Sequence, residues 1–249
     1  SEFLGSLHPV ELNSLINECK KKEQQEELLK HISGLDQLSK FIEHANEAIR
    51  EMTLSLIDDG RIAAIVRRME IDDAASLVGT LNRRKQVRIL KRLSANTVRE
   101  ISALLAHDLE TAGRIMTTLF LSLDSELKVE DAIKIIRQKL QEEEIDPDTH
   151  ISYIYIQDSE NKLIGICSLR ELLTASESAI LKNFMNENLV TVSPEDHQED
   201  VARLIADYNF SAIPVVSPEN GSVLGIITVD DVLDVIEEEY TEDLLKLAG

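Results

Sequence analysis

The residues with the clearest capacity for chemistry form an acidic stretch near the carboxyl terminus. Residues 230–243 contain eight Asp or Glu side chains and no Lys or Arg. Helical spacing would place Asp231, Asp234 and Glu238 on one face, where like charges destabilise a helix by roughly 0.2–0.5 kcal/mol per pair. Carboxylate oxygens also bind hard cations, and Mg²⁺ keeps several waters and is often held by only one or two carboxylates. The stretch therefore indicates either weak sites for hydrated Mg²⁺ or a solvated acidic face.

The same stretch predicts an amphipathic helix. Its apolar residues recur at helical spacing and would bury one stripe of that helix; they are Val229, Val232, Leu233, Ile236 and Tyr240. The sequence contains no Asp-x-Asp-x-Asp-Gly loop of the EF-hand type, which disfavours a tight Ca²⁺ site.

The negative charge is concentrated in the second half of the chain. The 249 residues carry 26 basic and 46 acidic side chains, a formal net charge of −20, and residues 115–249 contribute −19 of it. Phosphate contacts need clustered Lys and Arg, and base stacking needs aromatic residues. A chain this acidic, with 4% aromatic residues and no Trp, therefore does not fit a nucleic-acid partner. The imbalance points instead to cations.

No catalytic motif is present in the sequence. The six histidines form no HExxH pattern, and there is no GxSxG, no P-loop and no GxGxxG. Cys19 and Cys167 form no CxxC, which favours a reducing compartment. We therefore expect a regulatory or binding protein, with no catalytic residues, rather than an enzyme.

The first hundred residues have helical apolar spacing. Residues 71–105 divide into three amphipathic pieces whose starts recur roughly every dozen residues. Such short pieces are marginal alone, so we expect them to stack as in an α-solenoid, with an irregular helical bundle as the alternative. One piece carries a basic cluster that indicates a solvated face or a surface attracted to the acidic half or to an anionic membrane. The cluster consists of Arg83, Arg84, Lys85, Arg88, Lys91 and Arg92.

The second half contains an internal repeat. Residues 151–156 and 163–167 have strand-like patterns that return, 60 residues later, at 211–216 and 223–227. Met116 matches Met185 at an offset of 69, because the first copy alone holds an acidic insertion near 141–148. We expect two β–α–β–β–α modules that form one unit.

These motifs resemble known families. Modules that open like Ile115-Met116-Thr117 and close like 225–231 are similar to a pair of CBS domains, over about 115–239. The acidic start at 72–78, the junction 111–118 and the ending 228–243 resemble the cytosolic part of the MgtE family of magnesium transporters and channels.

The resemblance implies a multidomain α plus α/β fold, with an all-α superhelical N-domain followed by a tandem CBS pair. We expect the helical N-domain over 4–114, the first CBS domain over 115–178 and the second over 179–239. Residues 240–249 would begin a helix that connects to a membrane domain. The chain would then be the cytosolic part of such a protein, with its membrane domain absent.

The family pattern also implies the cation ligands. On the last CBS helix and the connecting helix it implicates Asp231, Asp234, Glu239, Glu242 and Asp243. Elsewhere it implicates Glu199 in the second CBS copy and Asp72 with Asp73 in the N-domain. The sequence departs from the pattern at Asn209, where a carboxylate is favoured, which would weaken one ligand set or route it through water.

CBS domains imply a second ligand, an adenine nucleotide such as ATP. The implied residues are Thr228 near phosphate and Asp231 on the ribose diol, with Pro214 beside them. The first copy has Ser168 and Glu171 at the positions of Thr228 and Asp231, with a carboxylate one carbon longer. The alternative is that Thr228 only caps the helix that follows it.

We therefore expect a Mg²⁺-sensing regulatory module of an MgtE-like transporter, at the cytoplasmic face of the membrane. Mg²⁺ bridging acidic residues would compact the module and close the pore. CBS pairs pack into symmetric dimers, so a homodimer and the chain's own transmembrane domain are the expected partners. The alternative function is an adenine-nucleotide-responsive CBS module without metal sensing.

Overall fold

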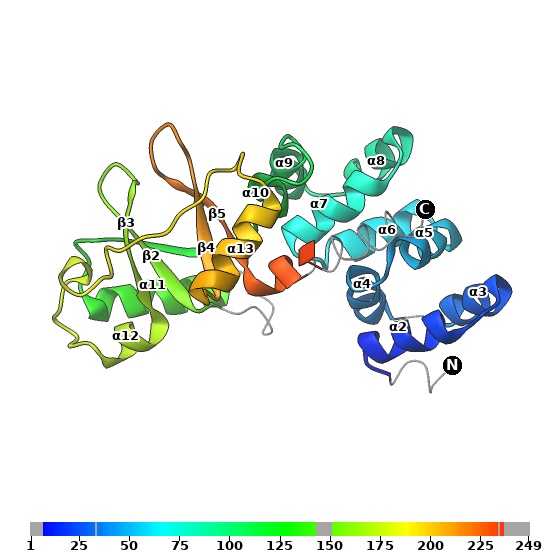
Figure 1. The fold of residues 1–249 in the computed structure, drawn as a ribbon, viewed down its shortest axis with the longest axis horizontal. Coiled ribbons are helices and arrows are strands. Elements are labelled where there is room, and N and C mark those ends of the chain that lie inside the picture. Colours follow the sequence, from blue (N-terminus) through cyan, green and yellow to red (C-terminus); the bar gives the residue numbers. More distant parts are fainter. Residues whose placement is uncertain (1–6, 33, 143–150, 234, 237–249) are drawn as a thin grey trace. The chain divides into compact units, whose positions relative to one another are not determined.

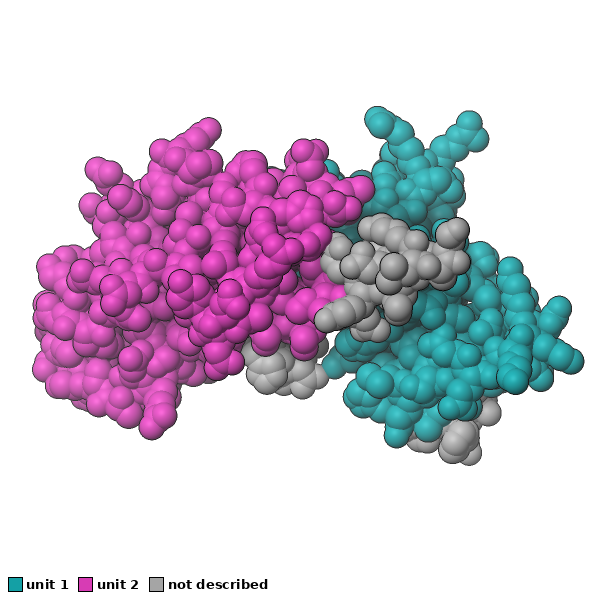
Figure 2. Space-filling view, viewed as in Figure 1, with its two compact units in different colours: residues 1–105 teal, residues 106–249 magenta. Residues whose placement is uncertain are grey.

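The structure separates the chain into two compact units. It is a computed structural model that describes residues 7–32, 34–142, 151–233 and 235–236 (Figure 1). Unit 1 comprises residues 1–105 and unit 2 comprises residues 106–249 (Figure 2). Each unit has its own core, and each is described separately.

Unit 1 is built from short helices. They are α2 Pro9–Glu18, α3 Lys22–Lys30, α4 Leu35–Glu43, α5 Glu47–Leu56, α6 Asp59–Val66, α7 Ile71–Thr80, α8 Arg83–Leu90 and α9 Ala95–Leu104. Helices two apart along the chain pack together: α2 with α4, α4 with α6 and α6 with α8 in one row, and α3 with α5 and α7 with α9 on the other side. This alternation is the superhelical stacking that the sequence predicted.

A twelve-residue period governs these helices. From α4 to α9 the residue that precedes each helix recurs at this interval; these N-cap residues are Gly34, Asn46, Asp58, Glu70, Asn82 and Ser94. Four of them accept hydrogen bonds from backbone N–H groups of the first turn, for example Asn82 Oδ1 from Lys85 at 3.1 Å. Such caps each stabilise a helix by about 1 kcal/mol. The period therefore sets where each helix from α4 to α9 begins.

The same period fixes the core of unit 1. The residue seven positions after each N-cap is buried in all six helices: Phe41, Thr53, Ile65, Leu77, Ile89 and Ile101. Thr53, the polar member, donates its hydroxyl to the Ile49 carbonyl at 2.7 Å, so its burial leaves that donor satisfied. Helices of 8–10 residues are marginal alone, and this recurring buried position stabilises them by packing.

Unit 2 contains two copies of one module. The first copy has β1 Leu121–Asp124, α11 Val129–Glu142, β2 Tyr153–Gln157, β3 Leu163–Ser168 and α12 Leu169–Thr174. The second has α13 Gln198–Tyr208, β4 Ala212–Val216, β5 Val223–Thr228 and helical residues 229–233 and 235–236. A short helix, α10 Ala112–Ile115, precedes the first copy, and a 3₁₀ turn at Leu181–Asn183 joins the two.

The sheets follow the β–α–β–β–α order that the repeat predicted. In the first copy β1 runs parallel to β2, which pairs antiparallel with β3. In the second copy β4 pairs antiparallel with β5, and the opening strand is represented by a parallel bridge between Val192 and Val215. The fold class expected from the sequence is confirmed in both units.

The two copies exchange their opening segments. Thr117, which opens the first copy, exchanges backbone hydrogen bonds of 2.8 and 2.9 Å with Ile226 in β5 of the second. Asn186, which opens the second copy, exchanges bonds of 2.8 and 3.0 Å with Ile166 in β3 of the first. Both pairs obey the sequence offsets of 69 and 60. Neither copy therefore completes its sheet without the other.

Two glycines allow this exchange. A Cβ on Gly225 would lie 2.6 Å from the backbone oxygen of Thr117, and one on Gly165 would lie 2.5 Å from the sulfur of Met185. The copies also share apolar residues along their contact: Tyr155 and Leu163 from the first pack with Val223 and Ile226 from the second. The closest approach of the copies thus depends on the absence of a side chain at positions 165 and 225.

We predict that Gly225→Ala destabilises the protein more than Gly165→Ala. At 225 the obstacle is backbone, which cannot rotate away, whereas at 165 it is a flexible Met side chain. Overpacking of this kind lowers the free energy of unfolding by about 1–3 kcal/mol. Urea denaturation of both variants measures the difference, and equal or reversed losses would contradict the exchange geometry.

Candidate cation and nucleotide site

The end of β5 holds two of the predicted nucleotide residues together. Thr228 is the last residue of this strand, and the chain is helical from residue 229. Both the backbone N–H and the hydroxyl of Thr228 donate to Asp231 Oδ2, at 3.0 and 2.5 Å. The Asp231 carboxylate is thereby turned back to the start of its own helix, beside the threonine hydroxyl.

The first copy repeats this arrangement at β3. Ser168 donates its N–H and its hydroxyl to Glu171 Oε2, both at 2.8 Å, and Glu171 N–H donates back to the hydroxyl at 3.1 Å. These bonds form a capping box, and the N–H and hydroxyl of Ser168 lower the pKa of the Glu171 carboxyl. Thr228 and Asp231 repeat the two bonds that run from the residue before the helix to the acid in its first turn.

Pro214 lies on the strand beside Thr228. It is buried in β4 opposite Ile226, while Ala212 stands opposite Thr228. Side chains alternate along a strand, so Pro214 and Thr228 share one face of the β4–β5 pair. Thr228 and Asp231 therefore lie at one end of the second sheet, and Pro214 lies on the same face in the middle of β4.

Glu199, the cation ligand implied on α13, already has a cationic partner. Arg203, one helical turn later, donates to Glu199 Oε2 at 3.1 Å and to Asp200 Oδ1 at 3.2 Å. A cation that bound Glu199 would compete with this guanidinium. Exposed pairs of this spacing contribute only about 0.3–0.5 kcal/mol, so the competition is mild.

Asp72 and Asp73 lie in the first turn of α7 in unit 1. Acidic residues at this position interact favourably with the helix dipole, which gives both a structural role. Asp72 is only 8% exposed, whereas Asp73 is exposed and lines a small pocket with Glu43, Arg50 and apolar neighbours. Arg50 in turn donates to the carbonyls of Glu43 and Ile42, at 3.2 and 3.3 Å, and closes the end of α4.

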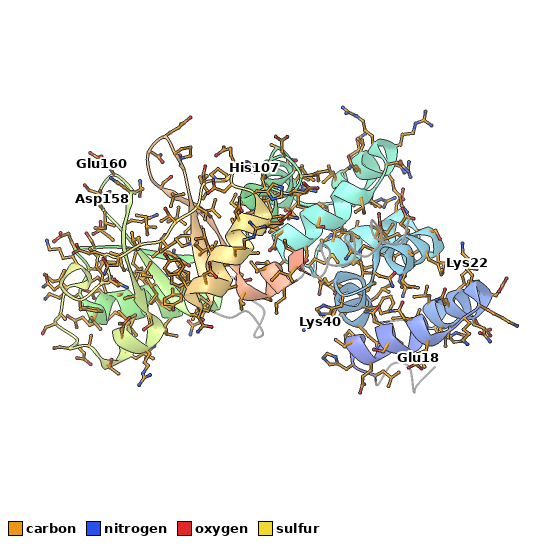
Figure 3. All side chains as sticks on the ribbon, viewed as in Figure 1. Glu18, Lys22, Lys40, His107, Asp158 and Glu160 are labelled. Atoms are coloured by element: carbon orange, nitrogen blue, oxygen red, sulfur yellow. The ribbon has the colours of Figure 1, made fainter. Side chains whose placement is uncertain are left out.

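The remaining implied ligands cannot be placed. Asp234, Glu239, Glu242 and Asp243 lie outside the described residues. Within the described ranges, no group of three or more His, Cys, Asp or Glu side chains is arranged to hold a metal ion. Other acidic residues have local roles: Asp158, labelled with Glu160 in Figure 3, accepts N–H bonds from Glu160 and Lys162 and closes the turn after β2.

The apolar stripe predicted for the last helix is partly wrong. Val232 and Val235 are buried, at 2% and 4% exposed, but Val229 and Leu233 are 43% and 60% exposed. The buried face of this helix therefore includes Val232 and Val235. Val229 and Leu233 form a second apolar line on the surface of unit 2.

Asn209 is the residue that ends α13. It adopts the left-handed conformation, with φ 54° and ψ 43°, and its N–H donates to the Ala206 carbonyl at 3.4 Å. Asn is favoured at such helix ends, second to Gly. An Asn directly after an amphipathic run is the sequence signal for this role, which the family pattern had obscured.

Comparison with known proteins assigns both units. The model of the MgtE intracellular N domain matches residues 7–110, and the CBS domain model matches residues 112–178 and 181–238. The crystal structure of the cytosolic domain of the Mg²⁺ channel MgtE in complex with ATP is 31% identical, with a TM-score of 0.81, over 94% of this chain and 92% of that one. The chain belongs to the MgtE family.

Other MgtE proteins agree with this assignment. The soluble part of a magnesium transporter is 31% identical, with a TM-score of 0.77, over 96% of this chain and 91% of that one. The magnesium transporter MgtE of Enterococcus faecalis is 40% identical over 150 residues, which is 60% of this chain and 32% of that protein. MgtE of Bacillus subtilis is 26% identical over 248 residues, which is 99% of this chain and 53% of that protein.

The match to MgtE covers only part of those transporters. The chain spans about a third to a half of the length of the curated relatives it matches. Among the described residues of the chain, no helix is long and apolar enough to cross a bilayer. The MgtE cytosolic domain is the part that this chain represents.

Proposed function

We propose that this MgtE module senses Mg²⁺ and controls an attached pore at the cytoplasmic face of a membrane. The observation that carries the proposal is the charge of the last part of unit 2, because residues 190–249 hold 14 acidic and 2 basic side chains. Relatives of the chain are named as magnesium transporters and as a Mg²⁺ channel. A module this acidic fits a regulator whose signal is a hard cation.

The proposed mechanism is electrostatic. Carboxylates that face one another repel when little Mg²⁺ is present, and the module is loose. Hydrated Mg²⁺ neutralises them and favours the compact state, to an extent set by its differential affinity for the two states. The proposed carboxylates are Asp231, Asp234, Glu239, Glu242, Asp243, Glu199, Asp72 and Asp73, and compaction would hold the connecting helices so that the pore closes.

We predict that neutralising Asp73 and Glu199 weakens Mg²⁺ binding at least tenfold. Both lie in the first turn of a helix, and their replacement by Asn and Gln keeps their size. Neither makes the strand-to-helix contact that Asp231 and Glu171 make. A bond between hydrated Mg²⁺ and a carboxylate is charge-assisted and is worth about 1.5 kcal/mol or more. Isothermal titration of Mg²⁺ into the Asp73→Asn, Glu199→Gln variant measures the loss.

The matched control is Glu51→Gln with Glu219→Gln, which makes the same change in charge, one residue in each unit, at exposed positions. Control and wild type should bind Mg²⁺ alike. Equal affinity in all three proteins would count against these ligands. The absence of Mg²⁺ binding to the wild type would overturn the sensing proposal itself.

An adenine nucleotide is the second candidate ligand. One solved relative holds ATP, and Thr228 and Asp231 meet at the end of β5, with Pro214 on the same face of the β4–β5 pair. The Asp231 carboxylate could leave the Thr228 hydroxyl and accept the ribose hydroxyls, which frees the threonine to donate to phosphate. The capping contact would then be the resting state of a nucleotide site.

We predict that Asp231→Asn weakens ATP binding at least tenfold, because an amide accepts the ribose hydroxyls less strongly than a carboxylate. Glu171→Gln makes the equivalent change in the first copy and should leave ATP affinity unaltered. Calorimetry with ATP, AMP and Mg²⁺ titrated separately measures the affinity for each ligand. Nucleotide heat with none from Mg²⁺ would favour the nucleotide-responsive alternative over metal sensing.

We also propose that the chain forms a twofold homodimer through its CBS pair. Leu173 on α12 and Leu233 on the last helix are related by the repeat offset of 60, and they are 62% and 60% exposed. Val229 lies beside Leu233 and is 43% exposed. Two equivalent apolar patches on one unit fit a symmetric interface that buries both.

We predict that Leu233→Glu weakens this dimer at least tenfold, because each chain would lose the burial of a Leu side chain, worth about 2 kcal/mol. Leu109→Glu is the matched control, since Leu109 is 76% exposed in the same unit and outside both helices. Analytical ultracentrifugation over a concentration series measures both variants. A wild-type chain that stays monomeric at high concentration would contradict the proposal.

A further inference from the structure

Helix α8 presents a strongly basic surface on a protein that is otherwise acidic. Residues 83–92 contain six basic side chains and no acidic one. Helical geometry places Arg83, Arg84, Arg88 and Lys91 within one broad face, opposite the buried Ile89. We call these four residues, with Val87 between them, the α8 basic face.

Little of this charge is neutralised within unit 1. Arg88 pairs with Asp59 of α6 at 2.5 Å. The structure gives no ion pair between Arg83, Arg84 or Lys91 and any residue that it describes. The bond from Arg88, with the nearby charges of Lys85 and Arg92, lowers the pKa of the Asp59 carboxyl, which reports a positive local field.

The fold does not require these charges. Arg83 and Arg84 stand in the first turn of α8, where the helix dipole disfavours cations, and no acidic residue is present in that turn. The helix start is instead capped by Asn82, and the packing of α8 on its neighbours uses Ile89. Arg83 and Arg84 thus oppose local helix stability, and the contacts of α8 with its neighbours are made by Ile89, by Arg88 and by Lys85, which donates to the Leu54 carbonyl.

Val87 adds an apolar element to the face. It is 46% exposed and lies between Arg84, Arg88 and Lys91 at i−3, i+1 and i+4. A basic helix face with an exposed apolar side chain suits the interface of an anionic bilayer, where headgroups take the cations and the boundary region takes the apolar group. The acidic half of a second copy would meet the charge but would leave Val87 unexplained.

We propose that the α8 basic face binds the anionic phospholipid headgroups of a membrane. The proposal rests on the proposed function in one respect, namely that the module works beside a bilayer. It does not depend on Mg²⁺ sensing. Binding would be electrostatic, reversible and weakened by salt, since no lipid anchor or long apolar face accompanies the charges among the described residues of unit 1.

Vesicle flotation with the full chain tests this proposal. The vesicles contain phosphatidylcholine alone or with phosphatidylglycerol, in EDTA so that Mg²⁺ sensing plays no part. We expect binding to the anionic vesicles at about 0.1 M NaCl, none to the neutral ones, and loss of binding near 1 M NaCl, where the Debye length is about 3 Å. Each neutralised base should weaken binding about fivefold.

The test variant is Arg83→Gln, Arg84→Gln, Lys91→Gln, which should bind roughly a hundredfold more weakly. The matched control is Lys30→Gln, Lys128→Gln, Arg137→Gln, three exposed bases outside the face with the same change in charge. The test variant should also unfold at the same urea concentration as wild type or higher, because it removes cations from a helix start. A merely structural role would lower its stability.

Three results would overturn the proposal: no wild-type binding to anionic vesicles at low salt, equal binding to neutral vesicles, or equal binding by the test and control variants. If the wild type ignores vesicles and the test variant alone changes the sedimentation of the free protein, the occupant is the acidic half of a second copy. Failure here with Mg²⁺ binding intact in calorimetry leaves the sensing proposal standing.

Discussion

The exchange of opening segments between the two CBS copies is the contact on which unit 2 depends. Thr117 completes the sheet of the second copy and Asn186 completes that of the first, and Gly225 and Gly165 leave room for the segments to approach. Because each copy lends a segment to the other, neither is a self-sufficient domain. The ends of β3 and β5, and the helices that begin there, are consequently fixed within one body.

This rigid unit carries an unusual charge. Residues 115–249 carry a net charge of −19, although the core of the fold is formed by apolar residues and does not need these charges. Repulsion between so many like charges destabilises a compact state unless cations neutralise them. Local pairs absorb little of it, since Arg203 serves both Glu199 and Asp200 and Asp231 is held by the neutral Thr228. The opposite extreme lies at residues 83–92 of unit 1, on α8 and the two residues after it, where six bases stand together. The two units therefore carry opposite local surfaces, each suited to a different ligand.

Much of this fold could be predicted from the sequence, because its periods are strict. The offsets of 60 and 69, which align the glycines and methionines of the two copies, also relate the Thr117–Ile226 pair to the Asn186–Ile166 pair. The dozen-residue spacing of the helix starts in unit 1 is the spacing of its N-cap residues. The pattern did not predict which apolar residues of the last helix are exposed, because that depends on what packs against the helix. Val229 and Leu233 have helical spacing but face outwards, and nothing in a single helix says which apolar line is buried.

The site was less predictable for the same reason. The contact of Thr228 with Asp231 and the pair of Arg203 with Glu199 are local, at spacings of three and four residues, and both can be found by inspection of helix starts and turns. The helix-ending role of Asn209 is also local and follows from its place directly after the amphipathic run of α13. Ligation by carboxylates from different elements is a three-dimensional property, and a one-dimensional pattern of acids does not determine it.

The central claim is that Mg²⁺ compacts the module by bridging carboxylates rather than by screening them. Small-angle X-ray scattering on the wild-type chain, in millimolar MgCl₂ and in NaCl of equal ionic strength, tests it most directly. We expect a smaller radius of gyration in MgCl₂ than in NaCl. A radius that is the same in both salts would contradict it.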